Sequence, residues 1–121
     1  MVPKIIAKGA SFKGAAAYLL HDKDHAASSD RVDWVETRNL ASDEPQRAGR
    51  IMGATAMDQT RLKTMAGVKA TGRKSAKSVL HLMLSWHPEE AEGLTPEEMM
   101  RAAIGALKAI GADSHQAMIV A

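Results

Sequence analysis

The residue best suited to nucleophilic chemistry is Tyr18, the only tyrosine in the chain. It lies near the N-terminus, in the segment AAAYLLHD at residues 15–22. A tyrosine phenol in water has a pKa near 10, so about one in a thousand is ionised at neutral pH. Attack on a phosphodiester also requires that the charge on the phosphoryl oxygens be neutralised. A tyrosine acting alone is therefore a poor nucleophile.

A second group of polar side chains lies in residues 79–87, where the apolar pattern predicts a strand. Because side chains alternate along a strand, His81, Ser85 and His87 share one face, and Trp86 lies with the leucines on the apolar face. Ser85 is placed either to contact a bound ligand or to hydrogen-bond neighbouring backbone, and the sequence leaves both open. His81 and His87 lie roughly 20 Å apart on such a strand, too far to bind one ion.

Tyr18 is expected on a short helix over residues 12–20, which Ser11 caps and which follows a strand over residues 2–8. The apolar stripe of this helix consists of Phe12, Ala16, Leu19 and Leu20. Tyr18 then lies at the edge of the stripe, on one strip with Gly14, where a ligand can approach the backbone closely. The structural alternative is a half-buried tyrosine on an amphipathic helix.

The remaining chain alternates between predicted strands and helices. We predict a loop over residues 22–30, a strand over 32–37, a helix from Pro45 to Gly67, a basic connection over 68–77, a capped helix from Thr95 to Gly111 and a strand over 115–121. A chain of 121 residues suits one domain. We expect an α+β fold in which helices pack on a ferredoxin-like or split βαβ sheet.

Charge is distributed unevenly. No acidic residue occurs from residue 59 to 88, whereas the following stretch to residue 113 is mainly acidic. The basic residues of the first stretch are Arg61, Lys63, Lys69, Arg73, Lys74 and Lys77. They form either a solvated surface or a phosphate-binding patch. The chain has no cysteine and no apolar run near the roughly 20 residues that span a bilayer, so we expect it in the cytoplasm without a membrane partner.

The order of these motifs resembles MobA/VirD-type relaxases, the HUH-like nucleases of plasmid mobilisation. The first motif of that family carries the nucleophilic tyrosine, which matches Tyr18. The second is a strand of the form His, three hydrophobic residues, Ser and an aromatic residue, which matches residues 81–86 and gives Ser85 the role of that motif. The third, His-x-Asp-x-x-His-x-His, binds the metal and would begin at or just after Ala121. We therefore expect residues 1–121 to form the N-terminal part of a relaxase domain, inactive alone.

The resemblance implies a conjugative relaxase that nicks and rejoins single-stranded DNA at an origin of transfer through a 5′-phosphotyrosyl intermediate. It implies Mg²⁺ or Mn²⁺ bound by ligands outside this chain, and as partners the origin DNA, accessory relaxosome proteins and a coupling protein. The expected DNA contacts are the six basic residues between Arg61 and Lys77, together with Arg38, Asn39 and His81. His21 and His25 lie four residues apart, but the helix is expected to end near His21, so we predict no metal site there.

Two alternatives remain. The first is a non-catalytic nucleic-acid-binding module of ferredoxin-like fold, which keeps the basic patch but uses no tyrosine chemistry. The second is an unrelated ferredoxin-like domain that binds proteins. A covalent DNA adduct distinguishes the enzyme from the first, and salt-sensitive binding of single strands argues against the second.

Overall fold

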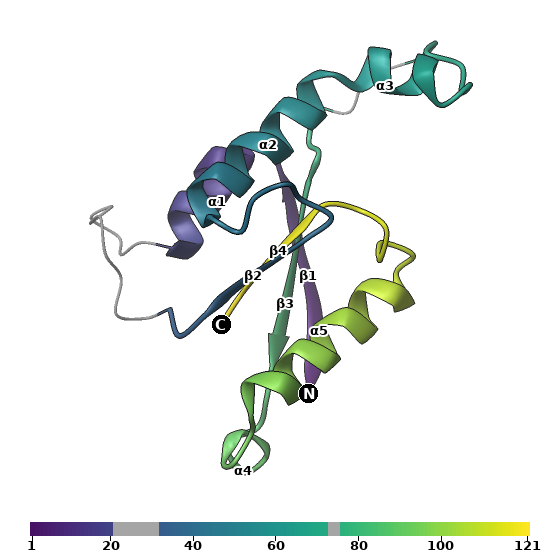
Figure 1. Cartoon of the computed structure of the whole chain (residues 1–121). Helices are drawn as coiled ribbons and strands as arrows, with labels where there is room; N and C mark the ends of the chain where they lie inside the picture. The colour runs from purple at the N-terminus through teal and green to yellow at the C-terminus, as the bar shows by residue number, and fades with distance from the viewer. Residues whose placement is uncertain (21–31, 73–75) are drawn as a thin grey trace. The chain divides into compact units, whose positions relative to one another are not determined.

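The structure is a computed structural model that describes residues 1–20, 32–72 and 76–121. Its elements in chain order are β1 (Val2–Gly9), α1 (Phe12–Leu20), β2 (Val35–Arg38), α2 (Pro45–Met57), α3 (Gln59–Met65), β3 (Val79–Ser85), α4 (Pro88–Ala91), α5 (Pro96–Ala109) and β4 (Ala117–Val120) (Figure 1). This mixture of helices and antiparallel strands confirms the α+β class. The chain divides into a first unit, Met1–Ala7 with Leu80–His115, and a second unit, Lys8–Val79 with Gln116–Ala121.

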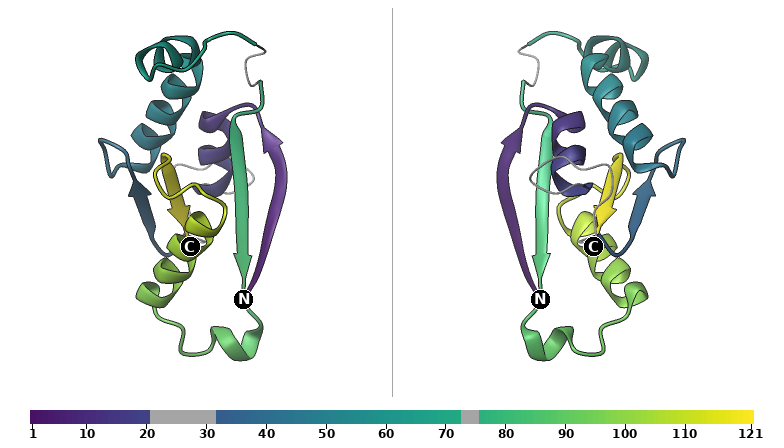
Figure 2. Two further views of the ribbon diagram at one scale, coloured as in Figure 1. Left: turned by 90° about the vertical axis from the view of Figure 1, so that its right-hand side faces the viewer. Right: turned by 90° about the vertical axis from the view of Figure 1, so that its left-hand side faces the viewer.

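The first unit contains most of β1 and β3, which pair with each other and run in opposite directions (Figure 2). Two capped helices follow β3. Thr95 accepts a hydrogen bond from the backbone N–H of Glu98 at 3.2 Å, and the Glu98 carboxylate accepts one from the Thr95 N–H at 3.0 Å. This reciprocal capping box begins α5 where the sequence predicts it, and Gly111 with φ +74° follows its end.

The second unit is built on the packing of α1 against α2 (Figure 1). Small residues form the contact: Ala16 and Ala48 are buried, and a Cβ placed on Gly49 would lie 3.1 Å from the Cβ of Ala16. The Ser11 hydroxyl accepts the N–H of Gly14 at 3.0 Å and caps α1. Beside this helix pair, β2 pairs antiparallel with β4, and α2 also contacts both strands.

Several predicted boundaries move. Within the described residues the strands form two two-stranded sheets, β1–β3 and β2–β4, rather than one ferredoxin-like sheet. β2 begins at Val35, although Trp34 before it exchanges backbone hydrogen bonds with Ala121 at 3.0 and 3.4 Å. The predicted helix from Pro45 to Gly67 is divided at Asp58 into α2 and α3. The predicted loop over residues 22–30 lies outside the described residues.

The strand predicted to reach His87 ends two residues earlier, at Ser85. Pro88 is the physical reason, because it has no N–H for a strand ladder and suits the first position of a helix. His87 instead caps α4, with its Nδ1 accepting the N–H of Glu89 at 3.2 Å. The predicted placement of His81 and His87 on one strand face is therefore wrong.

None of the helices in the described ranges has the length and apolar character needed to cross a bilayer.

Candidate active site

Tyr18 lies on the last turns of α1, and 64% of its side chain is exposed. The opposite side of the helix, at Ala16, is buried against α2. The sequence places Tyr18 at the edge of the apolar stripe, whereas the structure places it on the side opposite the buried Ala16, and the residue is more exposed than a half-buried structural tyrosine would be. α1 therefore presents the phenol to solvent from a helix whose other face is held by packing.

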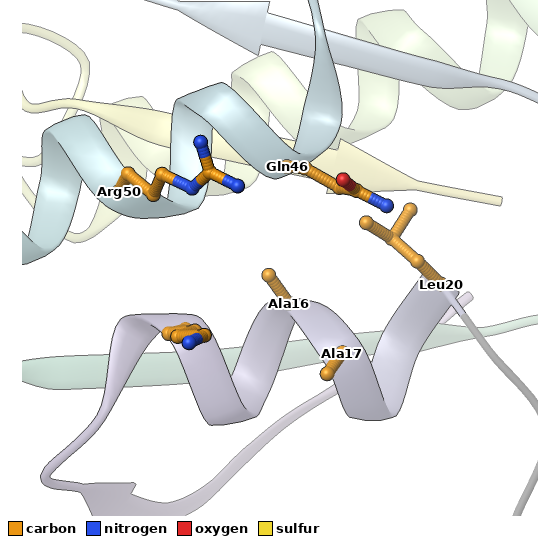
Figure 3. Close-up of a pocket in the computed structure, with 6 residues that line it drawn as sticks. Ala16, Ala17, Leu20, Gln46 and Arg50 are labelled. Carbon is orange, nitrogen blue, oxygen red and sulfur yellow. The ribbon is translucent and has the colours of Figure 1, made fainter. Parts of the chain in front are cut away.

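An open pocket of ≈ 180 Å³ lies between α1 and α2 (Figure 3). Gln46 and Arg50 on α2 lie across it from Ala16, Ala17 and Leu20 on α1. Lys13 completes the lining. Tyr18 follows Ala17 but projects about 100° further around the helix, away from Lys13, Ala16 and Leu20, so it does not line the pocket.

The pocket is cationic. Among the residues that the structure describes, neither Lys13 nor Arg50 has a carboxylate within ion-pair distance. Two cations that have no carboxylate partner in the described part of the chain, beside the apolar side chains of Ala16, Ala17 and Leu20, suit a phosphate attached to an apolar group. Sequence reasoning missed these residues, because Lys13 and Arg50 lie on different helices and meet only through packing. The one sequence signal is the helical spacing of Lys13 with Ala17 and of Gln46 with Arg50.

Of the six basic residues that we expect to contact DNA between Arg61 and Lys77, those that the structure describes all lie in the second unit. Arg61 donates to the Asp58 carboxylate at 2.7 Å, so its charge is partly neutralised by the residue that ends α2. Lys63 is half-buried, and Lys69 and Lys77 are exposed. Arg73 and Lys74 lie outside the described residues. The described part of this stretch therefore offers three lysines and one partly neutralised arginine to a polyanion.

Arg38 and Asn39 lie where β2 ends. Arg38 is half-buried, and its Nε is buried without a hydrogen-bond partner in the described part of the chain. Buried donors of this kind are normally satisfied by protein, water or ligand. Asn39 is exposed and turns the chain with φ 58°, in the left-handed region that asparagine tolerates. The pair thus combines a sharp turn with one donor that no described residue satisfies.

Ser85 and His81 lie on β3 in the first unit, whereas Tyr18 lies in the second. The hydroxyl of Ser85 donates to the backbone carbonyl of Val2 at 3.3 Å, and the residue is exposed. This is the backbone contact that the sequence left open as one of two possibilities. A hydroxyl also has acceptor capacity, so the residue can still accept a hydrogen bond from a ligand. His81 is half-buried.

The described residues do not fit a divalent metal. No group of three or more His, Cys, Asp or Glu residues in the described ranges is arranged to hold an ion. His87 is engaged as the cap of α4. His21 and His25 lie outside the described residues. The part of the chain that is described therefore contains no ligand set for the metal that the resemblance implies.

Comparison with known proteins gives one positive result. No curated protein and no solved structure matches the chain. A family model, described as relaxase, MobA/VirD2-like, nuclease domain, matches residues 18–121. The matched range begins at Tyr18 and contains the strand with His81 and Ser85. Because the match spans most of its length, this chain belongs to the MobA/VirD2-like relaxase nuclease family.

Proposed function

We propose that Tyr18 is the nucleophile of a relaxase that nicks and rejoins one strand of DNA at an origin of transfer. Membership of the nuclease family implies DNA nicking for mobilisation. The observation that carries the assignment to this residue is its placement: the single tyrosine of the chain is exposed on a helix anchored by its opposite face. Anchoring of this kind limits the positions that a nucleophile explores and so favours reaction with a correctly bound phosphate.

The reaction is a transesterification. The phenol oxygen of Tyr18 forms a bond to phosphorus, and the bond from phosphorus to the 3′ oxygen breaks. The phenol proton leaves, the departing oxygen ends as a free 3′-hydroxyl, and the 5′-phosphate stays linked to Tyr18. No electrons are gained or lost. Because one phosphodiester replaces another, the 3′-hydroxyl can reverse the step and rejoin the strand without another energy source.

The other residues bind and orient the strand in this proposal. Lys13 and Arg50 are placed to contact phosphates beside α1, and the exposed lysines of the basic stretch extend that contact. Arg38, whose buried Nε no described residue satisfies, would have to turn its side chain outward to contact the strand. Ser85 either accepts from a base amino group in its present orientation or leaves the Val2 carbonyl to donate to a phosphate. Relaxases commonly use a divalent metal, and we infer that it is bound by ligands other than the described residues.

The test compares Tyr18→Phe with the unchanged protein, each produced at the full length that its gene encodes. The substrate is a single-stranded oligonucleotide that carries the origin sequence and a label on the 3′ side of the nick. We expect a covalent protein–DNA adduct from the unchanged protein and none from Tyr18→Phe, with equal binding of the uncleaved strand. Phenylalanine keeps the ring and removes only the attacking oxygen.

The rival is a non-catalytic nucleic-acid-binding module. It predicts salt-sensitive binding by both proteins and an adduct from neither. An adduct that persists in Tyr18→Phe would instead show that another residue is the nucleophile. The experiment therefore separates loss of chemistry from loss of binding.

A further inference from the structure

Four exposed apolar side chains form a group at the end of α2, on α3 and just after it. We call Met57, Leu62, Met65 and Val68 the apolar arm. Met57 and Met65 are 88% and 71% exposed, and all four are exposed among the described residues. Figure 1 shows α1 along the first part of α2 and α3 beyond the other end of α2, within the same unit. These side chains are close in sequence, and apolar side chains that a unit leaves in water over one stretch of chain indicate a candidate interaction site.

The surroundings of the apolar arm indicate the partner. Arg61, Lys63 and Lys69 are interleaved with its members, and no acidic residue occurs from residue 59 to 88. Asp58, just before this range, is occupied by Arg61 at 2.7 Å. The interleaved cations and apolar side chains therefore favour a partner that carries negative charge close to apolar surface. DNA has this combination, because phosphates flank stacked bases.

The few aromatic residues of the chain favour one mode of DNA binding over another. Base stacking on proteins usually relies on aromatic side chains, but Tyr18 is the only exposed aromatic residue, and Phe12, Trp34 and Trp86 are half-buried. Methionine and leucine serve a different purpose in DNA recognition. They act as wedges that insert between base pairs, unstack them and distort the duplex, while basic neighbours hold the phosphates.

We propose that the apolar arm is such a wedge and separates base pairs of duplex DNA, so that one strand is released for cleavage. This is an activity additional to phosphodiester transfer. It rests on the proposed function only in that the released strand is the one that Tyr18 would attack. A substrate that is already single-stranded needs no wedge, and this difference makes the two activities separable.

The test uses a duplex oligonucleotide with 2-aminopurine at an internal position, because the fluorescence of this base rises when it is unstacked. We expect the full-length protein to raise the fluorescence several-fold. The double variant Met57→Gln/Met65→Gln should lose this rise and still bind a single-stranded oligonucleotide with unchanged affinity and salt dependence. Glutamine keeps the length of the side chain and removes its apolar end, and exposed positions tolerate the change without loss of fold, which circular dichroism checks.

Met83→Gln is the matched control, since Met83 is also an exposed methionine but lies on β3, in the first unit, whereas Met57 and Met65 belong to the second. It should leave the rise intact. The proposal is overturned if the unchanged protein binds the duplex without a rise, if the double variant keeps the rise, or if Met83→Gln abolishes it equally. A double variant that changes only the oligomeric state would assign the apolar arm to a protein contact and overturn the proposal too.

Tyr18→Phe distinguishes failure of the wedge from failure of the nuclease assignment. If the wedge is correct, Tyr18→Phe keeps the fluorescence rise. If the nuclease assignment is also correct, Met57→Gln/Met65→Gln keeps the covalent adduct on a single strand. A fluorescence rise without any covalent adduct would support the wedge and contradict the nuclease assignment. An adduct without a fluorescence rise would support the nuclease assignment and contradict the wedge.

Discussion

Glu90 shows how two local contacts set the ionisation of one side chain. Its carboxylate accepts a hydrogen bond from the Met1 ammonium group at 2.8 Å and from the backbone N–H of His87 at 3.3 Å. The hydrogen bond from Met1, then the bond from His87, then the positive charge of the ammonium group lower the pKa of Glu90 below its ordinary value of 4.5. The same carboxylate therefore joins the start of the chain to the cap of α4.

A depressed carboxyl pKa has a defined consequence for pH dependence. The stabilisation is fully present above the ordinary value of 4.5 and is lost as the pH falls through the lower pKa of the folded state. Because Glu90 is exposed, we expect a local loosening of Met1 and the first turn of α4 rather than unfolding. Following the Glu90 side-chain carbon by NMR against pH should give a midpoint below 4.5.

Acetylation of the N-terminal amine removes the larger cause and should raise the midpoint toward the ordinary value. Glu92→Gln is the control, because Glu92 ends α4 and should leave the Glu90 midpoint unchanged. A midpoint at or above 4.5 in the unmodified protein would contradict the contact with Met1.

At the scale of elements, the position of Tyr18 depends on how closely α1 approaches α2. Gly49→Ala places a methyl group 3.1 Å from the Cβ of Ala16, which is closer than ordinary packing allows. Alanine favours the helix by roughly 0.5–1 kcal/mol, but overpacking usually costs about 1–3 kcal/mol. Neither Cβ can rotate away, so we expect a net loss of about 1 kcal/mol in the free energy of unfolding, measured by urea denaturation.

Gly53→Ala is the matched control on the same helix, since nothing lies within 4 Å of the added methyl group. It should stabilise the protein by roughly 0.5–1 kcal/mol through helix propensity alone. Equal stabilisation by both substitutions would show that α1 and α2 are not in close contact at Ala16. Tyr18 would then lack the support that the proposed chemistry needs.

The elements also show which features can be predicted from the sequence. Sequence signals within a few residues are sufficient to predict three helix ends: Ser11 begins α1, Thr95 with Glu98 begins α5, and Gly111, with positive φ, follows the end of α5. The break at Asp58 escapes prediction, because no glycine or proline marks it within an otherwise continuous apolar stripe, and the Asp58 side chain does not cap α3 but binds Arg61. The start of β2 also escapes it, because the pairing of this strand depends on β4 at the other end of the sequence.

The candidate site divides in the same way. The exposure of Tyr18 follows from the periodicity of one helix, so the sequence is sufficient to predict it. The pocket with Lys13 and Arg50 requires the approach of two helices, and the cap at His87 requires the local effect of Pro88 to outweigh the strand pattern. Residues that act through tertiary contact carry no periodic signal, and a sequence pattern alone does not identify them.

At the scale of the whole molecule, charge is segregated along the chain. The acid-free residues 59–88 and the pocket with Lys13 and Arg50 provide positive charge, whereas residues 89–113 carry six of the fourteen acidic side chains. A net charge of only +2 would give weak, non-directional attraction to DNA if the charges were evenly mixed. Segregation makes binding depend on particular cations, and each such cation contributes to the salt dependence of affinity.

We expect Lys13→Gln/Arg50→Gln to weaken binding of a single-stranded oligonucleotide and to make the affinity less sensitive to salt. Removing one cation that contacts a phosphate should reduce the slope of log affinity against log salt concentration by about 0.7. Lys69→Gln should act in the same direction, by the amount expected for a single cation. The measurement is fluorescence anisotropy across a series of salt concentrations, which reports the slope independently of cleavage.

Arg101→Gln is the control, because Arg101 is an exposed cation on α5 within the acidic stretch. It removes a positive charge from a different part of the sequence and should leave the slope unchanged. If Arg101→Gln lowered the slope as much per charge as Lys13→Gln/Arg50→Gln, net charge would govern binding and the pocket would have no specific part in it. If the pocket variants lowered the slope and Arg101→Gln did not, the strand would pass along α1, the helix that carries Tyr18.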